Sequence, residues 1–257
     1  RSAPPWTSSA GCTGRWVAWS GPWAANASAS AEPALPGPRP RIAVLASGRG
    51  SNLQALLDAI AAGTLDAEIA GVFSDRPAAT ALQRVHGSLR WSRDARDYAR
   101  RADFDAALAE GVAAAHPDWI FCAGYMRILG DAFIERFAGR ILNIHPSLLP
   151  LYRGLRTHAR ALEAGDAEHG ASVHFVVPEL DAGAVVAQAR VPVLPGDDAG
   201  SLERRVRGVE HPLLVAVMQL AAEGRLAERD ATVLLDGHPL FTPLQLDSSG
   251  RLYPGTA

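Results

Sequence analysis

The sequence predicts an α/β protein with a doubly wound, mainly parallel sheet and antiparallel additions towards its C-terminal end. Three observations predict this fold class. Short apolar runs alternate with segments of helical periodicity from residue 41 to residue 144. A glycine-rich loop joins the first apolar run to the first helical segment. Beyond Pro150, two strand-like segments follow one another closely, which favours a hairpin-like addition to the parallel sheet.

Hydrophobic periodicity predicts the strands and helices between residues 41 and 144. Continuous apolar runs predict buried strands at residues 42–46, 68–73, 118–123 and 141–144. Apolar side chains at helical spacing predict helices at residues 53–62, 78–85, 103–115 and 130–137. Strands that are separated by helices are expected to run parallel, so this half should form the doubly wound core.

The second half is expected to cover and extend the sheet. The patterns predict a short helix at 157–164, strands at 171–177 and 185–193, and a long helix at 201–222. Pro192 indicates an edge position, because proline cannot donate to a strand ladder. The tail from residue 231 to residue 253 could add short edge strands.

Composition bounds the possible functions. With 25 basic and 27 acidic residues the net charge is −2. The chain therefore lacks the strong positive charge that is typical of nucleic-acid-binding proteins. No apolar stretch reaches membrane-spanning length. The chain has no lysine, which excludes Schiff-base chemistry and a Walker lysine. Its two cysteines are far apart and its histidines lack metal-ligand spacing, so a disulfide framework or a metal site is not expected.

Domain organisation follows from a change in composition near residue 40. Residues 1–40 are rich in Pro, Ala, Ser and Gly without periodicity, so we interpret them as a disordered or spurious N-terminal extension. Residues 41–257 are expected to form a single domain with halves at 41–140 and 141–257. We expect a cytoplasmic protein that is a monomer or a homodimer.

The stretch from Asn143 to Pro150 follows an apolar strand directly. Open α/β sheets bind ligands at the carboxyl ends of their strands. Asn143 and His145 are two residues apart, so in an extended segment both side chains leave the same face. An amide and an imidazole side by side can polarise one carbonyl and stabilise its oxyanion. The alternative for a lone histidine is a local hydrogen bond at a strand end.

Three further segments could complete such a site. Gly48 to Asn52 lies between a strand and a helix, where backbone amides can hold a phosphate, although a tight turn can be merely structural. Asp181 lies in a glycine turn and could pair with His145, or simply form that turn. Glu210 could hold a substrate amine or hydroxyl from the long helix, or face solvent.

These motifs together resemble the phosphoribosylglycinamide formyltransferase family. The resemblance covers residues 41–237 in order and with compatible spacing. It is carried by Ser-Gly-Arg-Gly-Ser-Asn at 47–52, Met-Arg-Ile-Leu at 126–129, Asn-Ile-His-Pro-Ser-Leu-Leu-Pro at 143–150 and Leu-Asp-Ala-Gly at 180–183. The segment Pro212-Leu213-Leu214-Val215 departs from the family pattern, and this makes the placement of Glu210 less certain.

The resemblance implies a Rossmann-like formyltransferase fold, with a phosphate-binding half at 41–140 and a catalytic and folate-binding half at 141–257. It implies a catalytic trio of Asn143, His145 and Asp181, with His174 in a supporting role. It implies substrate-binding roles for Gly50, Ser51, Asn52 and Glu210, and folate-binding roles for Arg101, Met126, Arg127, Ile128, Leu129 and Asn143.

The activity implied is formyl transfer in de novo purine biosynthesis without a metal. The amine of glycinamide ribonucleotide would attack 10-formyltetrahydrofolate directly, through a tetrahedral intermediate. Methionyl-tRNA formyltransferase would need a further C-terminal domain, and only about 35 residues follow the long helix. Formyltetrahydrofolate hydrolase would need an N-terminal regulatory domain. A binding protein on the same fold would not need the trio.

Overall fold

The computed structural model describes residues 38–255. The expected extension at residues 1–40 therefore lies outside the described residues, apart from its last three. Within the described part the main sheet has nine strands, in the order β12-β11-β7-β6-β5-β4-β1-β2-β3. The core strands are β1 (Arg41–Leu45), β2 (Glu68–Ser74), β3 (Arg90–Ser92), β4 (Trp119–Cys122), β5 (Ile141–His145), β6 (Glu168–Phe175) and β7 (Val185–Pro192).

The centre of the sheet is parallel, as the alternation of strands and helices predicts. β1 pairs in parallel with both β2 and β4, and β5 pairs in parallel with β4. The chain therefore reverses its direction of travel across the sheet between β1 and β4. The loops that follow these two strands diverge at this switch point, where open α/β folds bind their ligands.

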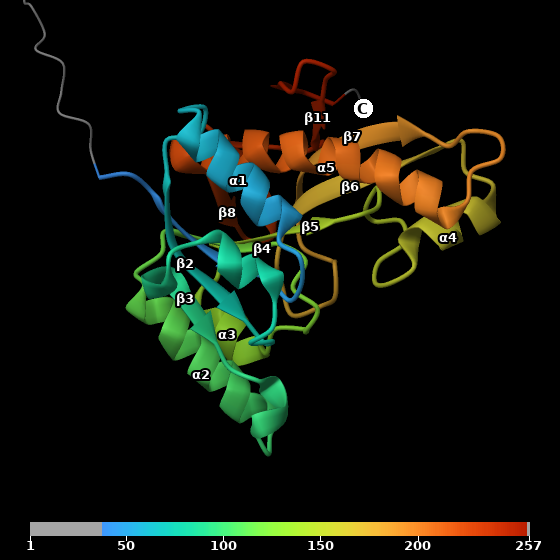
Figure 1. The fold of residues 1–257 in the computed structure, drawn as a ribbon. Coiled ribbons are helices and arrows are strands. Elements are labelled where there is room, and N and C mark those ends of the chain that lie inside the picture. Colours follow the sequence, from blue (N-terminus) through green and yellow to red (C-terminus); the bar gives the residue numbers. More distant parts are fainter. Residues whose placement is uncertain (1–37, 256–257) are drawn as a thin grey trace, which may run out of the picture. The chain divides into compact units, whose positions relative to one another are not determined.

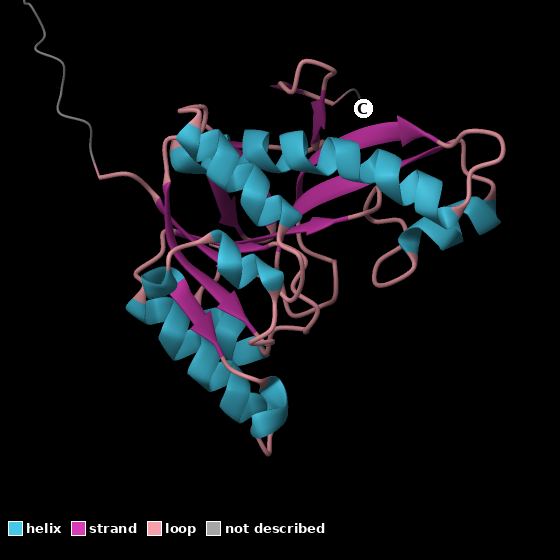
Figure 2. Ribbon diagram, viewed as in Figure 1, coloured by secondary structure: helices cyan, strands magenta, loops and turns pink. Residues whose placement is uncertain are grey.

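Helices cover both faces of the sheet (Figures 1 and 2). One face carries α1 (Ser51–Ala61) and α5 (Ala199–Ala222), which pack against each other. The other face carries α2 (Arg101–Ala114) and α3 (Asp131–Arg136), whose apolar side chains form a separate buried cluster with the sheet. Leu202, Val206, Leu213 and Val217 of α5 are fully buried, so one apolar stripe of this helix faces the core.

The second half extends the sheet with antiparallel strands, as predicted. β6 pairs antiparallel with both β5 and β7. The helix between β5 and β6 is α4 (Thr157–Ala164). The tail supplies β11 (Leu244–Leu246) and β12 (Leu252–Tyr253) to one edge of the main sheet. It also forms a separate three-stranded sheet from β8 (Leu226–Arg229), β9 (Thr232–Leu235) and β10 (His238–Pro239).

Three local predictions need correction. Residues 78–85 do not form an α-helix but contain a 3₁₀ helix, η1 (Thr80–Arg84). The strand β3 at the other edge was not predicted, and it is flanked by the 3₁₀ turns η2 (Gly87–Leu89) and η3 (Ala95–Asp97). β7 is not an edge strand, because β11 pairs with it at Ala187 and Gln188. Pro192 is tolerated because it lies at the strand end, beyond this pairing.

Candidate active site

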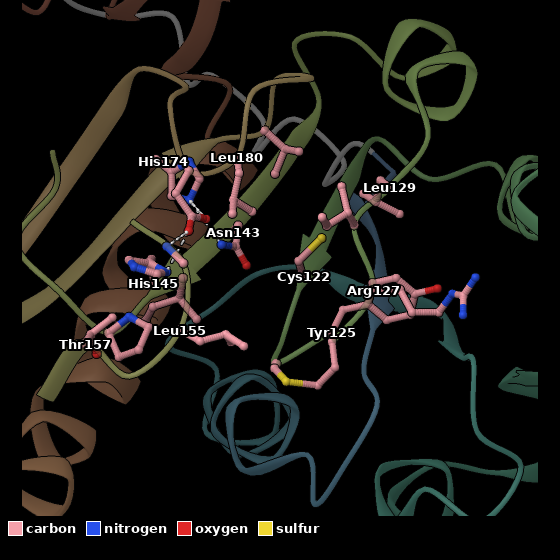
Figure 3. A pocket seen from close by; sticks show the side chains of 18 of the residues that line it. Cys122, Tyr125, Arg127, Leu129, Asn143, His145, Leu155, Thr157, His174 and Leu180 are labelled. Carbon is pink, nitrogen blue, oxygen red and sulfur yellow. Dashed lines mark hydrogen bonds and ion pairs between the residues drawn. The ribbon is translucent and has the colours of Figure 1, made fainter. Parts of the chain in front are cut away.

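A cavity of about 520 Å³ opens at the carboxyl ends of β4 and β5. It is lined mainly by residues of the segments 122–129, 143–146, 154–158 and 174–181. Figure 3 shows Asn143, His145 and His174 gathered on one side of this cavity, with Tyr125 and Arg127 on the other. The predicted strand-end motif therefore lies where the fold places ligands.

The antiparallel pairing of β5 and β6 brings two polar side chains together. Asn143 lies directly opposite His174 in the ladder, and His145 lies opposite Ser172. Residues directly opposite in a ladder project to the same face. Asn143 and His145 are two residues apart and both line the cavity, as the alternation of side chains in a strand requires.

His145 is held through both ring nitrogens. Its Nε2 is 3.0 Å from the carbonyl oxygen of Tyr152, which can only accept, so Nε2 carries a hydrogen. Its Nδ1 is 3.3 Å from Oδ2 of Asp181, and the ring is 6% exposed. Each ring nitrogen of His145 therefore faces an oxygen atom.

His174 is held as a neutral ring. Its Nδ1 donates to the carbonyl oxygen of Phe175 at 2.8 Å, which leaves Nε2 as the acceptor of the neutral ring. Burial lowers the pKa of His174 to about 4, since desolvation disfavours the charged form. Nδ2 of Asn143 lies 3.1 Å from this Nε2 and donates to it. The neutral His174 therefore orients the Asn143 side chain so that its NH₂ group, rather than its oxygen, faces β6.

Asp181 lies between the two histidines. Its Oδ2 accepts from the amide of Gly154 at 2.8 Å, and its Oδ1 is 3.6 Å from His174 Nε2. The turn that carries it packs tightly against β6: a Cβ on Gly183 would lie 1.9 Å from the carbonyl oxygen of Phe175. Asp181 itself has a positive φ of 48°. Glycine at 183 is needed for this close approach, which brings the carboxylate to His145.

The 124–129 loop forms the other wall of the cavity. Met126 and Ile128 expose 60% and 53% of their surfaces, so this wall presents apolar groups. Arg127 stacks over the ring of Phe104 with its guanidinium carbon 4.9 Å from the ring centre. Within residues 38–255, the hydroxyl of Tyr125 and Nε of Arg127 are buried without a hydrogen-bond partner. Both groups are available to a ligand or a bound water.

Arg101 does not line the cavity but supports the loop that does. Its guanidinium donates to the carbonyl oxygen of Ile128 and pairs with Asp105 at 3.4 Å. Burial raises the pKa of Asp105, and the nearby charges of Arg101 and Arg127 oppose that shift. Arg101 therefore contacts the predicted folate-binding segment through its backbone.

The segment from Gly48 to Asn52, hereafter the glycine loop, lies outside the cavity. Gly50 has a φ of 71°, and an added Cβ would lie 2.7 Å from Cβ of Ala81. α1 begins at the next residue, so its free amide groups face the loop. Arg84 closes the loop from the side by donating to the carbonyl oxygen of Arg49 at 2.8 Å.

Glu210 is also placed outside the cavity lining. It is half-buried on α5, the helix that packs against α1. Burial raises the pKa of its carboxyl group, and the charge of Arg207 opposes this. The predicted site thus divides in two. The catalytic candidates and most folate-binding candidates line the cavity, whereas Arg101, the glycine loop and Glu210 do not.

The sequence profile of the family described as formyl transferase matches residues 40–218 of this chain. The match includes β1 to β7 and most of α5. It therefore contains the glycine loop, the 124–129 loop and the residues that line the cavity. The chain belongs to the formyl transferase family. Within this family it is 44% identical to a phosphoribosylglycinamide formyltransferase of Escherichia coli over 201 residues. That alignment covers 77% of this chain and 95% of the relative.

Solved structures of a formyltransferase and of a deformylase resemble this chain. A phosphoribosylglycinamide formyltransferase from Coxiella burnetii superimposes with a TM-score of 0.74 at 42% identity, over 84% of this chain and all of that chain. A formyltetrahydrofolate deformylase from Pseudomonas syringae gives a TM-score of 0.68 at 27% identity. In that comparison only 66% of the other chain is covered.

Some contributors to the site had no signal in the sequence. Tyr152 contributes a carbonyl oxygen at a φ of 57°, a conformation that its side chain does not indicate. Gly154 contributes an amide, and its position in a proline- and glycine-rich turn could have indicated a tight loop. Ser47 and Asp75 are buried polar residues beside these loops. Ser47 is the first residue of the Ser-Gly-Arg-Gly-Ser-Asn motif, but the sequence assigned no role to its hydroxyl or to Asp75.

Residues 38–255 contain no group of three or more His, Cys, Asp or Glu side chains arranged to hold a metal ion. In the same residues, every helix is too short or too polar to cross a bilayer.

Proposed function

We propose that this chain transfers the formyl group of 10-formyltetrahydrofolate to the amine of 5-phosphoribosylglycinamide. The observation that carries the proposal is the arrangement of Asn143, His145 and Asp181 on one wall of the cavity opposite the 124–129 loop. A formyl carbon held between these walls would have an amide and an imidazolium beside its oxygen. Membership of the formyl transferase family supports the same reaction.

In the proposed mechanism the substrate amine attacks the formyl carbon and forms a tetrahedral intermediate. One hydrogen of Asn143 Nδ2 is directed to His174, so the other remains for the developing oxyanion. We assign His145 Nε2 as the second donor, because Nδ1 faces Asp181. The formyl oxygen would replace the Tyr152 carbonyl as acceptor of this hydrogen.

Asp181 stabilises the charged His145 and sets its orientation. Collapse of the intermediate breaks the bond between the formyl carbon and N10 of the folate. The amine must lose one proton and N10 must gain one. We propose that Asp181 mediates this transfer through water, since its carboxylate lies at the cavity wall. His174 acts as a positioning residue for the Asn143 amide.

Binding roles complete the proposal. Backbone amides of Gly50, Ser51 and Asn52 at the start of α1 would hold the substrate phosphate, and Glu210 would hold another polar group of the same substrate. Met126 to Leu129 would contact the folate, with Arg101 supporting Ile128 from behind. The proposal includes a cytoplasmic monomer or homodimer that uses no metal.

The test follows the absorbance of the folate product with and without glycinamide ribonucleotide. We expect product only when the nucleotide is present, and one formylated nucleotide for each folate released. Product without the nucleotide would indicate a hydrolase, and no product in either case would indicate a binding protein. The 42% identity to the solved transferase, against 27% to the solved deformylase, favours the transferase over the hydrolase.

A further inference from the structure

Ser47 joins two loops that the proposed function assigns to different substrates. It follows β1 and immediately precedes the glycine loop. Its amide donates to the carbonyl oxygen of Gly124 at 3.2 Å, and its Oγ accepts from the amide of Met126 at 2.9 Å. The residue before the glycine loop is therefore hydrogen-bonded twice to the 124–129 loop.

Asp75 fixes the direction of the Ser47 hydroxyl. The Ser47 Oγ donates to Asp75 Oδ1 at 2.5 Å, and both residues are buried. The amide of Met126 can only donate, so Ser47 must accept from it and direct its single hydrogen elsewhere. A carboxylate can only accept. The order Met126 amide, Ser47 hydroxyl, Asp75 carboxylate is thus the one arrangement that satisfies each group.

The sheet topology explains why these three residues meet. Asp75 follows β2, Ser47 follows β1, and Met126 lies in the loop after β4. These three strands are neighbours in the sheet and run parallel, so their carboxyl ends share one edge. The chain of hydrogen bonds therefore crosses the switch point beneath both loops.

We propose that Ser47 and Asp75 are positioning residues that couple nucleotide binding at the glycine loop to folate binding at the 124–129 loop. This inference rests on the proposed function. A nucleotide that orders the glycine loop fixes Ser47, and Ser47 holds the Met126 amide in place. Because binding coupling is reciprocal, a folate at the 124–129 loop strengthens nucleotide binding by the same factor.

The test measures the dissociation constant of tetrahydrofolate by calorimetry, with and without saturating glycinamide ribonucleotide. We expect the nucleotide to tighten tetrahydrofolate binding several-fold in the unaltered chain, and to have no such effect in Ser47→Ala. The KM for the formyl-folate should rise about tenfold in this variant, because the Met126 amide loses its acceptor. The value of kcat at saturation should change less than threefold.

Ser74→Ala is the matched control. Ser74 is as buried as Ser47 and lies at the end of β2, but its hydroxyl bonds only to the backbone of Arg76 among the described residues. We expect this variant to keep the coupling factor and both KM values. Equal loss of coupling in Ser47→Ala and Ser74→Ala would overturn the inference, as would a coupling factor of one in the unaltered chain.

A second pair of variants decides the matter if Ser47→Ala does not fold. Asp75→Asn keeps an acceptor oxygen for the Ser47 hydroxyl and should retain the coupling, whereas Asp75→Ala should lose it. If Asp75→Asn and Asp75→Ala both keep the coupling factor of the unaltered chain, the inference is overturned. If the unaltered chain transfers no formyl group, the proposed function itself fails. Normal transfer with unchanged coupling in these variants overturns only the role of Ser47 and Asp75.

Discussion

The proposed catalytic cluster of Asn143, His145, His174 and Asp181 and the glycine loop are built from different parts of the chain. The cluster consists of buried and half-buried side chains that contact one another around β5 and β6. The glycine loop offers backbone groups at the start of α1, and its shape depends on the positive φ of Gly50. Side-chain chemistry is therefore concentrated in the first region, and backbone conformation decides the second.

This difference predicts opposite responses to substitution. Truncating a side chain should damage the cluster, whereas adding a Cβ should damage the glycine loop. The titration of buried imidazoles should affect only the cluster, because the glycine loop contains no histidine. Three experiments test these expectations, in decreasing order of effect.

The largest effect is expected from His145→Ala and Asp181→Ala. Each removes a group that acts on the developing oxyanion, directly or through its neighbour, so kcat should fall about 10²- to 10³-fold, or ~3–4 kcal/mol. Steady-state kinetics of the purified variants measure this, and circular dichroism checks that the fold is kept. His238→Ala, at an exposed position on β10, should leave kcat unchanged. Near-normal turnover in both cluster variants would remove them from the catalytic trio.

A smaller effect is expected from Gly50→Ala in the glycine loop. The new Cβ would press on the backbone of Ala81 and force alanine into a left-handed conformation, at about 1–2 kcal/mol for the backbone alone. The KM for the nucleotide should rise at least tenfold, with a smaller change in the KM for the folate. Gly48→Ala is the matched control, since its Cβ would meet nothing within 4 Å. Equal nucleotide KM values for the two variants would contradict a backbone-determined phosphate site.

The smallest effect on kinetics at neutral pH is expected from the titration of His174, which acts instead on stability in acid. Burial holds its folded-state pKa at about 4, below the unfolded value of about 6.5. The unfolded chain therefore binds more protons between these values, so the free energy of unfolding falls as the pH drops from 6.5 towards 4. We expect a loss of roughly 2 kcal/mol from this group between pH 7.5 and pH 5, measured by urea unfolding.

His174→Gln isolates that contribution. A neutral amide cannot titrate, so the variant should be less stable at pH 7.5 but should lose less stability on acidification. An unchanged dependence on pH would show that His174 is not the group responsible. His169, whose pKa burial also lowers to about 4, would then be the next histidine to substitute.

Much of the fold follows from the sequence because its strands are continuous apolar runs. β1, β2, β4 and β5 lie where those runs predict them, and α4 has the predicted bounds. The failures concern short elements. Residues 78–85 carry apolar side chains at helical spacing but form only a 3₁₀ turn. β3 has three residues, too few for a period to be recognised.

The site could be predicted where side chains carry the chemistry. Asn143 and His145 are two residues apart on a strand, so their shared face follows from geometry. The pairing of His145 with Asp181 was expected, and their atoms lie 3.3 Å apart. The carbonyl of Tyr152 and the hydroxyl of Ser47 could not be predicted. A backbone acceptor has no residue preference, and a buried serine is common in any core.

The pairing of Asn143 with His174 has a consequence for altering this protein. The two residues are opposite one another in an antiparallel ladder, so their contact depends on the alignment of β5 with β6. One residue inserted into β6 before His174 would turn that ring to the other face of the sheet. A longer segment between the two strands would not disturb the alignment. The span before α4 holds Tyr152 and Gly154, which contact His145 and Asp181. The span between α4 and β6 is therefore the place to graft new sequence, and β6 must keep its length.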